Sequence, residues 1–150
     1  MKSLGIVFSM DGRLEKFLEN FNKLDREHLN LLSSMYAEDV SFLDPIHEIQ
    51  GREPLRRYFD RMYKNTISCR FEWDSRLMLG NEAMVAWRMV LRHKALAGGK
   101  EFWVPGASLL RFQQGGDLVL YHRDFYDAGS LLYERIPGLS QVIKLIKSQV

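Results

Sequence analysis

The sequence predicts an α+β domain in which helices pack on the concave face of a cone-shaped, curved antiparallel sheet. Three observations support this fold class. In the first part of the chain, apolar residues recur every three or four positions, which is typical of helices. From about residue 68 the pattern becomes that of long strands separated by glycine-containing turns. A final apolar segment with helical spacing closes the chain.

The helical part of the pattern contains several segments. An expected first helix has an apolar face formed by Leu14, Phe17, Leu18, Phe21 and Leu24. Asp25 is expected to cap a second helix, and Pro54 is suited to the first turn of a third. Between these two helices, a short strand around Val40 and Phe42 should end at Pro45, because proline cannot donate a hydrogen bond to a neighbouring strand.

Four long strands are expected in the second half, at Arg70–Leu79, Glu82–Leu96, Lys100–Gln113 and Leu118–Asp127. The glycine turns between them favour an antiparallel meander. Pro105-Gly106 predicts a bulge or a sharp bend inside the third strand. The last helix should be kinked or divided at Pro137-Gly138. A strongly bent sheet with helices on its concave side leaves a conical interior, which is a common ligand site.

Composition narrows the function classes. The 21 basic and 19 acidic residues give a net charge of +2, and they are interspersed, so nucleic-acid binding is not expected. The single cysteine, Cys69, cannot form an intrachain disulfide, which favours a reducing cytoplasmic location. The histidines do not fall at metal-ligand spacings, and no P-loop or Gly-x-Ser-x-Gly motif is present. Lys144 and Lys147 lie beside apolar residues in the last helix, but docking on its own domain or on a dimer partner is favoured over membrane-surface binding.

Two segments resemble a known family. The first is YAEDVSFLDPIHEIQGREPLRRYF at Tyr36–Phe59, and the second is GDLVLYHRDFYDAGSLLYERI at Gly116–Ile136. Together they resemble the nuclear transport factor two-like superfamily, and within it the SnoaL-like polyketide cyclase and limonene epoxide hydrolase branches. The resemblance implies one domain over residues 1–150, a cystatin-like α+β barrel, and a homodimer formed through the outer face of the sheet. Relatives include cofactor-free enzymes and proteins that only bind ligands.

Asp44 is the first candidate catalytic residue. In ketosteroid isomerase-like relatives, the aspartate of an Asp-Pro pair after the first strand is the general base, and Asp44-Pro45 matches that pair. A carboxylate in an apolar pocket can move a proton near neutral pH, although Asp-Pro is also a common turn signal. The resemblance places Ser108 near the position of the isomerase's acid, so that site is incomplete here. His47 is expected at the pocket rim.

Asp124 is the second candidate, because HRDFYD at His122–Asp127 resembles a phrase of limonene epoxide hydrolase that carries a catalytic aspartate. Alternation along the strand predicts that His122, Asp124 and Tyr126 share one face with Leu118 and Leu120. Two alternatives follow for this aspartate. It could be an acid/base group assisted by His122, or a buried carboxylate that is paired with an arginine and holds the sheet together.

The pocket is expected to hold a hydrophobic small molecule, without a metal or another cofactor. Arg88, Trp103 and Tyr126 are the preferred wall residues, together with Ser108 and His47. The residues leave open three functions. The first is cofactor-free acid/base catalysis of an isomerase, cyclase or hydrolase type. The second is ligand binding without turnover, and the third is association through a dimer interface.

Overall fold

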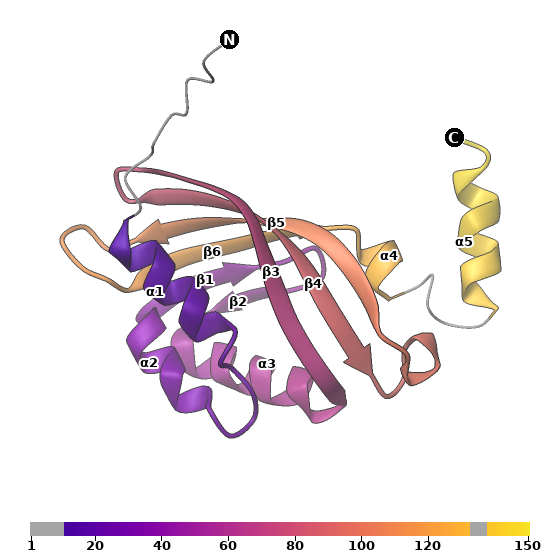
Figure 1. Ribbon diagram of the computed structural model, residues 1–150, viewed down its shortest axis with the longest axis horizontal. Coiled ribbons are helices and arrows are strands. Elements are labelled where there is room, and N and C mark those ends of the chain that lie inside the picture. The colour runs from indigo at the N-terminus through magenta and orange to yellow at the C-terminus, as the bar shows by residue number, and fades with distance from the viewer. Residues whose placement is uncertain (1–10, 133–137) are drawn as a thin grey trace, which may run out of the picture.

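A computed structural model describes residues 11–132 and 138–150 (Figure 1). Three helices come early in the chain, α1 (Gly12–Phe21), α2 (Leu32–Met35) and α3 (Arg52–Lys64). The six strands are β1 (Tyr36–Leu43), β2 (Glu48–Gln50), β3 (Thr66–Leu79), β4 (Glu82–His93), β5 (Phe102–Phe112) and β6 (Val119–Tyr126). Short 3-10 turns occur at Leu29–Leu31 and Ala97–Gly99, and α4 (Ala128–Leu131) and α5 (Leu139–Lys147) follow β6.

The strands form one curved, open sheet in the order β2-β1-β6-β5-β4-β3. The first three helices lie against its concave face (Figure 1). This confirms the α+β class and the curved sheet, with two corrections. The sheet is mixed rather than antiparallel, because β1 pairs parallel with β6. The short strand β2 was not expected; it folds back on β1 directly after the Asp-Pro turn and pairs with it antiparallel.

Local sequence explains where the helices begin. The Asp11 side chain accepts a hydrogen bond from the Arg13 backbone N–H at 2.9 Å and caps α1. Gly51 precedes α3 with a φ of 97°, a conformation that side chains other than glycine rarely adopt. Asp25 does not cap an α-helix as expected. Its carboxylate accepts from the Glu27 backbone N–H at 2.9 Å instead, within a turn that leads to the first 3-10 segment.

Two details of strand register decide which side chains face inward. A bulge or a sharp bend was expected at Pro105-Gly106. Strands β4 and β5 pair without interruption from Glu82 to Leu91, so there is no bulge at this position. A register shift occurs instead in β6, between the residues paired with Arg111 and Phe112. Because of this extra residue, Leu120 turns outward and is exposed, whereas His122 remains buried. The expectation that Leu120 shares a face with His122 is therefore wrong.

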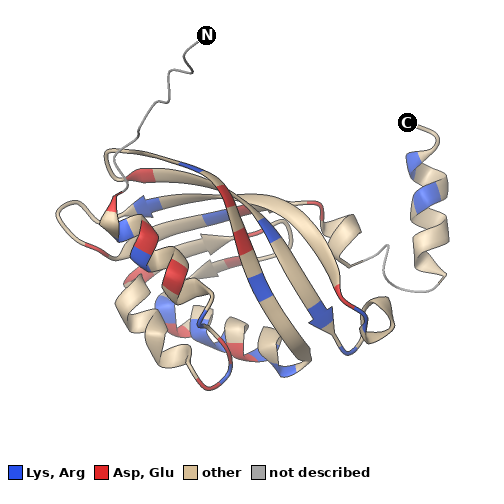
Figure 2. Cartoon of the chain, in the orientation of Figure 1, with Lys and Arg blue, Asp and Glu red and all other residues tan. Residues whose placement is uncertain are grey.

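The C-terminal segment is divided into α4 and α5, and Pro137 lies outside the described residues. Helix α5 stands apart from the sheet (Figure 1) and exposes Leu139, Val142, Leu145 and Ile146. It contacts the domain through an ion pair of 3.4 Å between Lys147 Nζ and Asp127 Oδ2. Charges of both signs are interspersed over the rest of the fold (Figure 2). No helix within the described ranges is long and apolar enough to cross a membrane.

Candidate functional site

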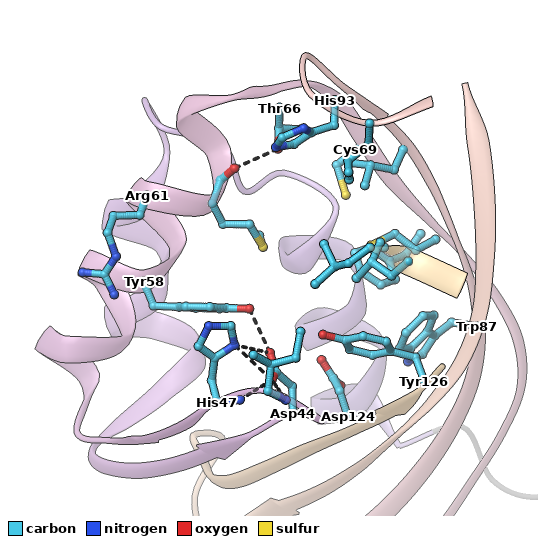
Figure 3. Close-up of a pocket in the computed structure, with 18 of the residues that line it drawn as sticks. Asp44, His47, Tyr58, Arg61, Thr66, Cys69, Trp87, His93, Asp124 and Tyr126 are labelled. Carbon is cyan, nitrogen blue, oxygen red and sulfur yellow. Dashed lines mark hydrogen bonds and ion pairs between the residues drawn. The ribbon is translucent and has the colours of Figure 1, made fainter. Parts of the chain in front are cut away.

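A cavity of about 380 Å³ lies inside the cone, between α3, the inner face of the sheet and α4. Its walls are largely apolar and include Met62, Phe71, Met89, Leu91 and Leu132. A group of polar side chains gathers at one end of it (Figure 3), formed by Asp44, His47, Tyr58, Asp124 and Tyr126. A mainly apolar cavity with a few polar groups brought together is the usual form of a small-molecule site.

Asp124 is fixed through one of its two oxygens. Its Oδ1 accepts a hydrogen bond from the Ser108 hydroxyl at 2.5 Å and is 2.6 Å from His122 Nε2. The side chain is only 14% exposed and lines the cavity. Within residues 11–132 and 138–150, no hydrogen bond is made to Oδ2. This arrangement leaves one carboxylate oxygen free for a ligand while the other holds the group in place.

His122 lies behind Asp124 and does not line the main cavity. Its Nδ1 is 2.8 Å from the hydroxyl of Tyr36, which is completely buried. Burial raises the pKa of Tyr36 well above its ordinary value, so this hydroxyl keeps its proton and is assigned as a hydrogen-bond donor to Nδ1. With Nδ1 assigned as the acceptor, the ring N–H lies on Nε2 and donates a hydrogen bond to Asp124. His122 is thus a positioning donor rather than a second base in contact with a ligand.

Asp44 is held by many donors. Its Oδ1 accepts from the backbone N–H groups of Ile46 at 2.8 Å and His47 at 2.7 Å. The hydroxyl of Tyr58 donates to its Oδ2 at 3.0 Å, and His47 Nδ1 lies 3.1 Å from both oxygens. The carboxylate is only 2% exposed. These contacts make Asp44 the anchor of the loop between β1 and β2, with its lone pairs already occupied.

Two tyrosines stand beside the carboxylates. Burial raises the pKa of Tyr58, and the negative charge of Asp44 raises it further. Burial likewise raises the pKa of Tyr126, and the negative charges of Asp44 and Asp124 raise it further. Both hydroxyls therefore remain protonated at neutral pH and can donate hydrogen bonds. Figure 3 shows the Tyr126 hydroxyl and the Asp124 carboxylate directed to the same part of the cavity.

The structure places two expected wall residues outside the pocket. Arg88 and Trp103 lie on the convex face, where the guanidinium stands 5.3 Å from the centre of the indole ring. Arg88 also pairs with Glu72 at 3.4 Å, and Trp103 is 54% exposed. The reason is strand alternation, because Trp87 and Phe102 point inward and their neighbours must point outward. Pairing with an arginine was one of the two alternatives for Asp124, and the structure shows contacts with Ser108 and His122 instead.

The other expected site residues divide into two groups. Asp44, Asp124, Tyr126 and the partly exposed His47 line the cavity, whereas Ser108 and His122 are buried beneath Asp124. Sequence reasoning missed the role of Tyr58, which lies on the apolar face of α3 and reads as a core residue. It missed Tyr36 for the same reason. The only signal in the sequence for Tyr36 was its hydroxyl group. At a buried position this hydroxyl needs a hydrogen-bond partner from the protein, because water cannot reach it.

Two further features limit the chemistry of the site. Among the described residues, no group of three or more His, Cys, Asp or Glu side chains could hold a metal ion. Cys69 lines the cavity, but burial raises the pKa of its thiol to about 12, so very little nucleophilic thiolate is present at neutral pH. The groups suited to reaction are therefore the free Asp124 oxygen and the tyrosine hydroxyls.

This combination of a curved sheet, helices on its concave face and a mainly apolar pocket is the nuclear transport factor two-like (NTF2-like) architecture. The SnoaL-like domain family matches residues 14–121, most of the chain. The chain belongs to the SnoaL-like family. No match was found among curated proteins.

Solved structures show the same fold at low sequence identity. A protein from Catenulispora acidiphila with a ketosteroid isomerase-like fold, solved in complex with trimethylamine, has a TM-score of 0.70 and 19% identity, covering 84% of this chain and 94% of its own. An NTF2-like protein of unknown function from Burkholderia pseudomallei has a TM-score of 0.70 and 14% identity, covering 84% and 95%. A proposed SnoaL-like polyketide cyclase from Jannaschia has a TM-score of 0.68 and 15% identity, covering 83% and 88%.

Proposed function

We propose that the protein is a cofactor-free acid/base catalyst that removes a proton next to the carbonyl group of a hydrophobic small molecule. The observation that carries this proposal is the asymmetry of Asp124. One oxygen is fixed by Ser108 and His122, and the other is unengaged in an apolar cavity. A positioned carboxylate with little access to water is suited to general base catalysis.

In the proposed reaction, Asp124 Oδ2 takes a proton from the carbon beside the carbonyl. The electrons of the C–H bond form a carbon–carbon double bond, and the carbonyl oxygen gains negative charge. The Tyr126 hydroxyl, which is directed into the same part of the cavity, donates a hydrogen bond to this oxygen and stabilises the enolate. Return of the proton from Asp124 to another carbon completes an isomerisation. Alternatively, the enolate carbon attacks a second carbonyl of the same molecule, and the proton on Asp124 passes to the resulting alkoxide, which completes a cyclisation. Neither outcome needs an oxidant or a metal to balance.

Asp124→Asn is a well-matched variant for testing this proposal. The amide oxygen can still accept from Ser108 and His122, so the fold and the cavity should be preserved while the base is lost. The assay is incorporation of deuterium from D2O into 2-tetralone and phenylacetone, followed by proton NMR. We expect exchange with wild-type protein well above buffer, and a loss of roughly a hundredfold or more in the variant. The exposed carboxylate Asp39 on β1 supplies the control Asp39→Asn.

Either of two results would refute the proposal. If the wild-type protein does not raise the rate of deuterium incorporation into either ketone above the rate in buffer, the proposed proton-transfer activity is absent. Exchange by Asp124→Asn at the wild-type rate would remove this residue from the reaction.

A second candidate function is binding of a small protonated amine without turnover. Two carboxylates, Asp44 and Asp124, lie in a cavity that is also lined by the aromatic rings of Tyr58, Trp87 and Tyr126. Carboxylates and aromatic faces together attract alkylammonium ions. The structurally similar protein from Catenulispora acidiphila was solved with trimethylamine, which favours this candidate. Calorimetric titration should then show binding of tetramethylammonium and none of neutral tert-butanol; equal affinities would contradict it.

The outer face of the sheet is the proposed interface of a homodimer. It exposes Trp103 and Phe125, and Arg123 stacks on Phe125 with its guanidinium 4.9 Å from the ring centre. Exposed aromatic and arginine side chains are enriched at protein interfaces. Light scattering at micromolar concentration should report a dimer for the wild-type protein and a monomer for Phe125→Asp. A wild-type monomer would contradict this interface.

A further inference from the structure

The indole group of Trp87 is the start of a hydrogen-bond chain that ends on Asp124. Its Nε1–H donates to the Ser108 hydroxyl oxygen at 2.8 Å. Because that oxygen is accepting from Trp87, the hydroxyl proton of Ser108 is directed away from the indole and toward Asp124 Oδ1, at 2.5 Å. Both Trp87 and Ser108 are buried, so water does not compete for these groups.

Gly106 explains why the indole can take this position. Trp87 and Gly106 are paired across β4 and β5. A side chain at Gly106 would place its Cβ 2.2 Å from Trp87 Cη2 and 2.5 Å from Cζ2, far inside van der Waals contact. The ring therefore lies directly on the glycine backbone. From there its N–H reaches Ser108, two residues further along the same face of β5.

The ring is also held from its other sides. Phe71 packs edge-on against Trp87 with ring centres 5.1 Å apart, and Tyr126 lies 6.3 Å away. Trp87 lines the main cavity as well as the small hollow behind Asp124. The Trp87 side chain thus forms part of the cavity wall and is also the first donor in the series of hydrogen bonds that fixes the Asp124 carboxylate.

From this geometry we infer that Trp87 is a positioning residue, which acts through Ser108 to hold Asp124 Oδ1 in place and leave Oδ2 directed at the ligand. Opposite it, His122 fixes the same oxygen from the Tyr36 side. The carboxylate is therefore oriented by two donors from different strands, and rotation that would present Oδ1 to the cavity breaks both bonds. This inference rests on the proposed function of Asp124 as the base.

The test uses Trp87→Phe, which keeps an aromatic ring and removes the indole N–H. Trp73→Phe is the matched control, because Trp73 lines the same small hollow and stacks on Phe71 at 5.2 Å. We expect Trp87→Phe to lower the rate of deuterium exchange into 2-tetralone about tenfold, whereas Trp73→Phe stays near the wild-type rate. Equal rates in the two variants would overturn the inference.

A double-mutant cycle separates positioning from simple packing. If Trp87 acts through Ser108, then Trp87→Phe should cause no further loss of rate in a Ser108→Ala background. If the rate losses of the two single variants multiply in the double variant, Trp87 has a packing role only. The same assay with Asp124→Asn distinguishes the two proposals. If Asp124→Asn loses exchange but the Trp87 and Ser108 variants act independently of each other, this inference is rejected and the proposed function is retained.

A spectroscopic measurement tests the same hydrogen bonds without an activity assay and without replacing the buried Trp87. The chain has three tryptophans, so the indole N–H region of a ¹⁵N–¹H spectrum is readily assigned. In Asp124→Asn, the Trp87 indole resonance should move because its acceptor Ser108 now bonds to a neutral group, while the Trp73 and Trp103 resonances stay in place. An unchanged Trp87 resonance would contradict the proposed chain.

Discussion

Raising the pH from about 9 to about 11 should destabilise the fold through its buried tyrosines, and Tyr58→Phe isolates one of them. Burial and the nearby Asp44 raise the pKa of Tyr58 far above that of an unfolded tyrosine, which is 10.0. Above about pH 10 the unfolded chain therefore releases this proton and the folded chain keeps it. Stability is fully present below the unfolded pKa and falls as the pH rises beyond it.

The size of the effect follows from proton linkage. Each such tyrosine reduces the free energy of unfolding by about 1.4 kcal/mol between about pH 9 and about pH 11. Tyr63 is buried on the same helix, its pKa is also raised, and it should contribute a similar amount. Urea unfolding at several pH values should show that the alkaline loss is smaller by about 1.4 kcal/mol in Tyr58→Phe than in the wild type.

Met62→Leu is the control for this experiment, because Met62 lines the same cavity and carries no titratable group. It should reproduce the wild-type pH dependence even if it shifts the overall stability. If Tyr58→Phe loses as much stability on alkalinisation as the wild type, the Tyr58 hydroxyl is not kept protonated by burial. The assignment of Tyr58 as a protonated donor to Asp44 would then fail.

Three further predictions concern the rest of the molecule. Tyr36→Phe leaves the buried His122 Nδ1 without its donor, so urea unfolding should show a loss of about 1–3 kcal/mol; an unchanged stability would reject that bond. At about pH 8, Cys69 should react with iodoacetamide about a thousandfold more slowly in the folded than in the unfolded protein, because burial raises the pKa of its thiol to about 12. Equal rates would show that the folded protein has an accessible thiolate. Trp103→Ala should leave deuterium exchange into 2-tetralone unchanged, since the indole lies on the convex face; a large loss would place it in the pocket.

Periodicity predicted most of the fold because burial follows it closely. The first helix buries its expected apolar face at Leu14, Phe17, Leu18 and Phe21. The four long strands appear with ends shifted by a few residues, and the turn at Gly80 has the positive φ that its glycine suggests. The parallel pairing of β1 with β6 was beyond such reasoning. It joins segments far apart in the chain, and no local pattern encodes that contact.

The site was predicted in part, and its errors have a common cause. Alternation assigns residues to two faces of a strand, but it does not say which face is inside or where a bulge changes the sides. Asp124 and Tyr126 were placed correctly in the cavity, whereas Arg88 and Trp103 were assigned to the wrong face. Pro105-Gly106 was interpreted as a bulge or a sharp bend, whereas the structure shows that the absence of a side chain at Gly106 makes room for the Trp87 ring. Because that close contact is made between two strands, the sequence of either strand alone does not predict it.

The central claim is a division of labour between two carboxylates, with Asp124 as the base and Asp44 as the anchor. The most direct test measures exchange into 2-tetralone and urea stability for Asp124→Asn and Asp44→Asn side by side. The account predicts that Asp124→Asn loses exchange at nearly wild-type stability. Asp44→Asn should lose about 1–3 kcal/mol of stability, because its donors lose a charged acceptor, and should retain measurable exchange. Full exchange in Asp124→Asn together with none in a stable Asp44→Asn would contradict it.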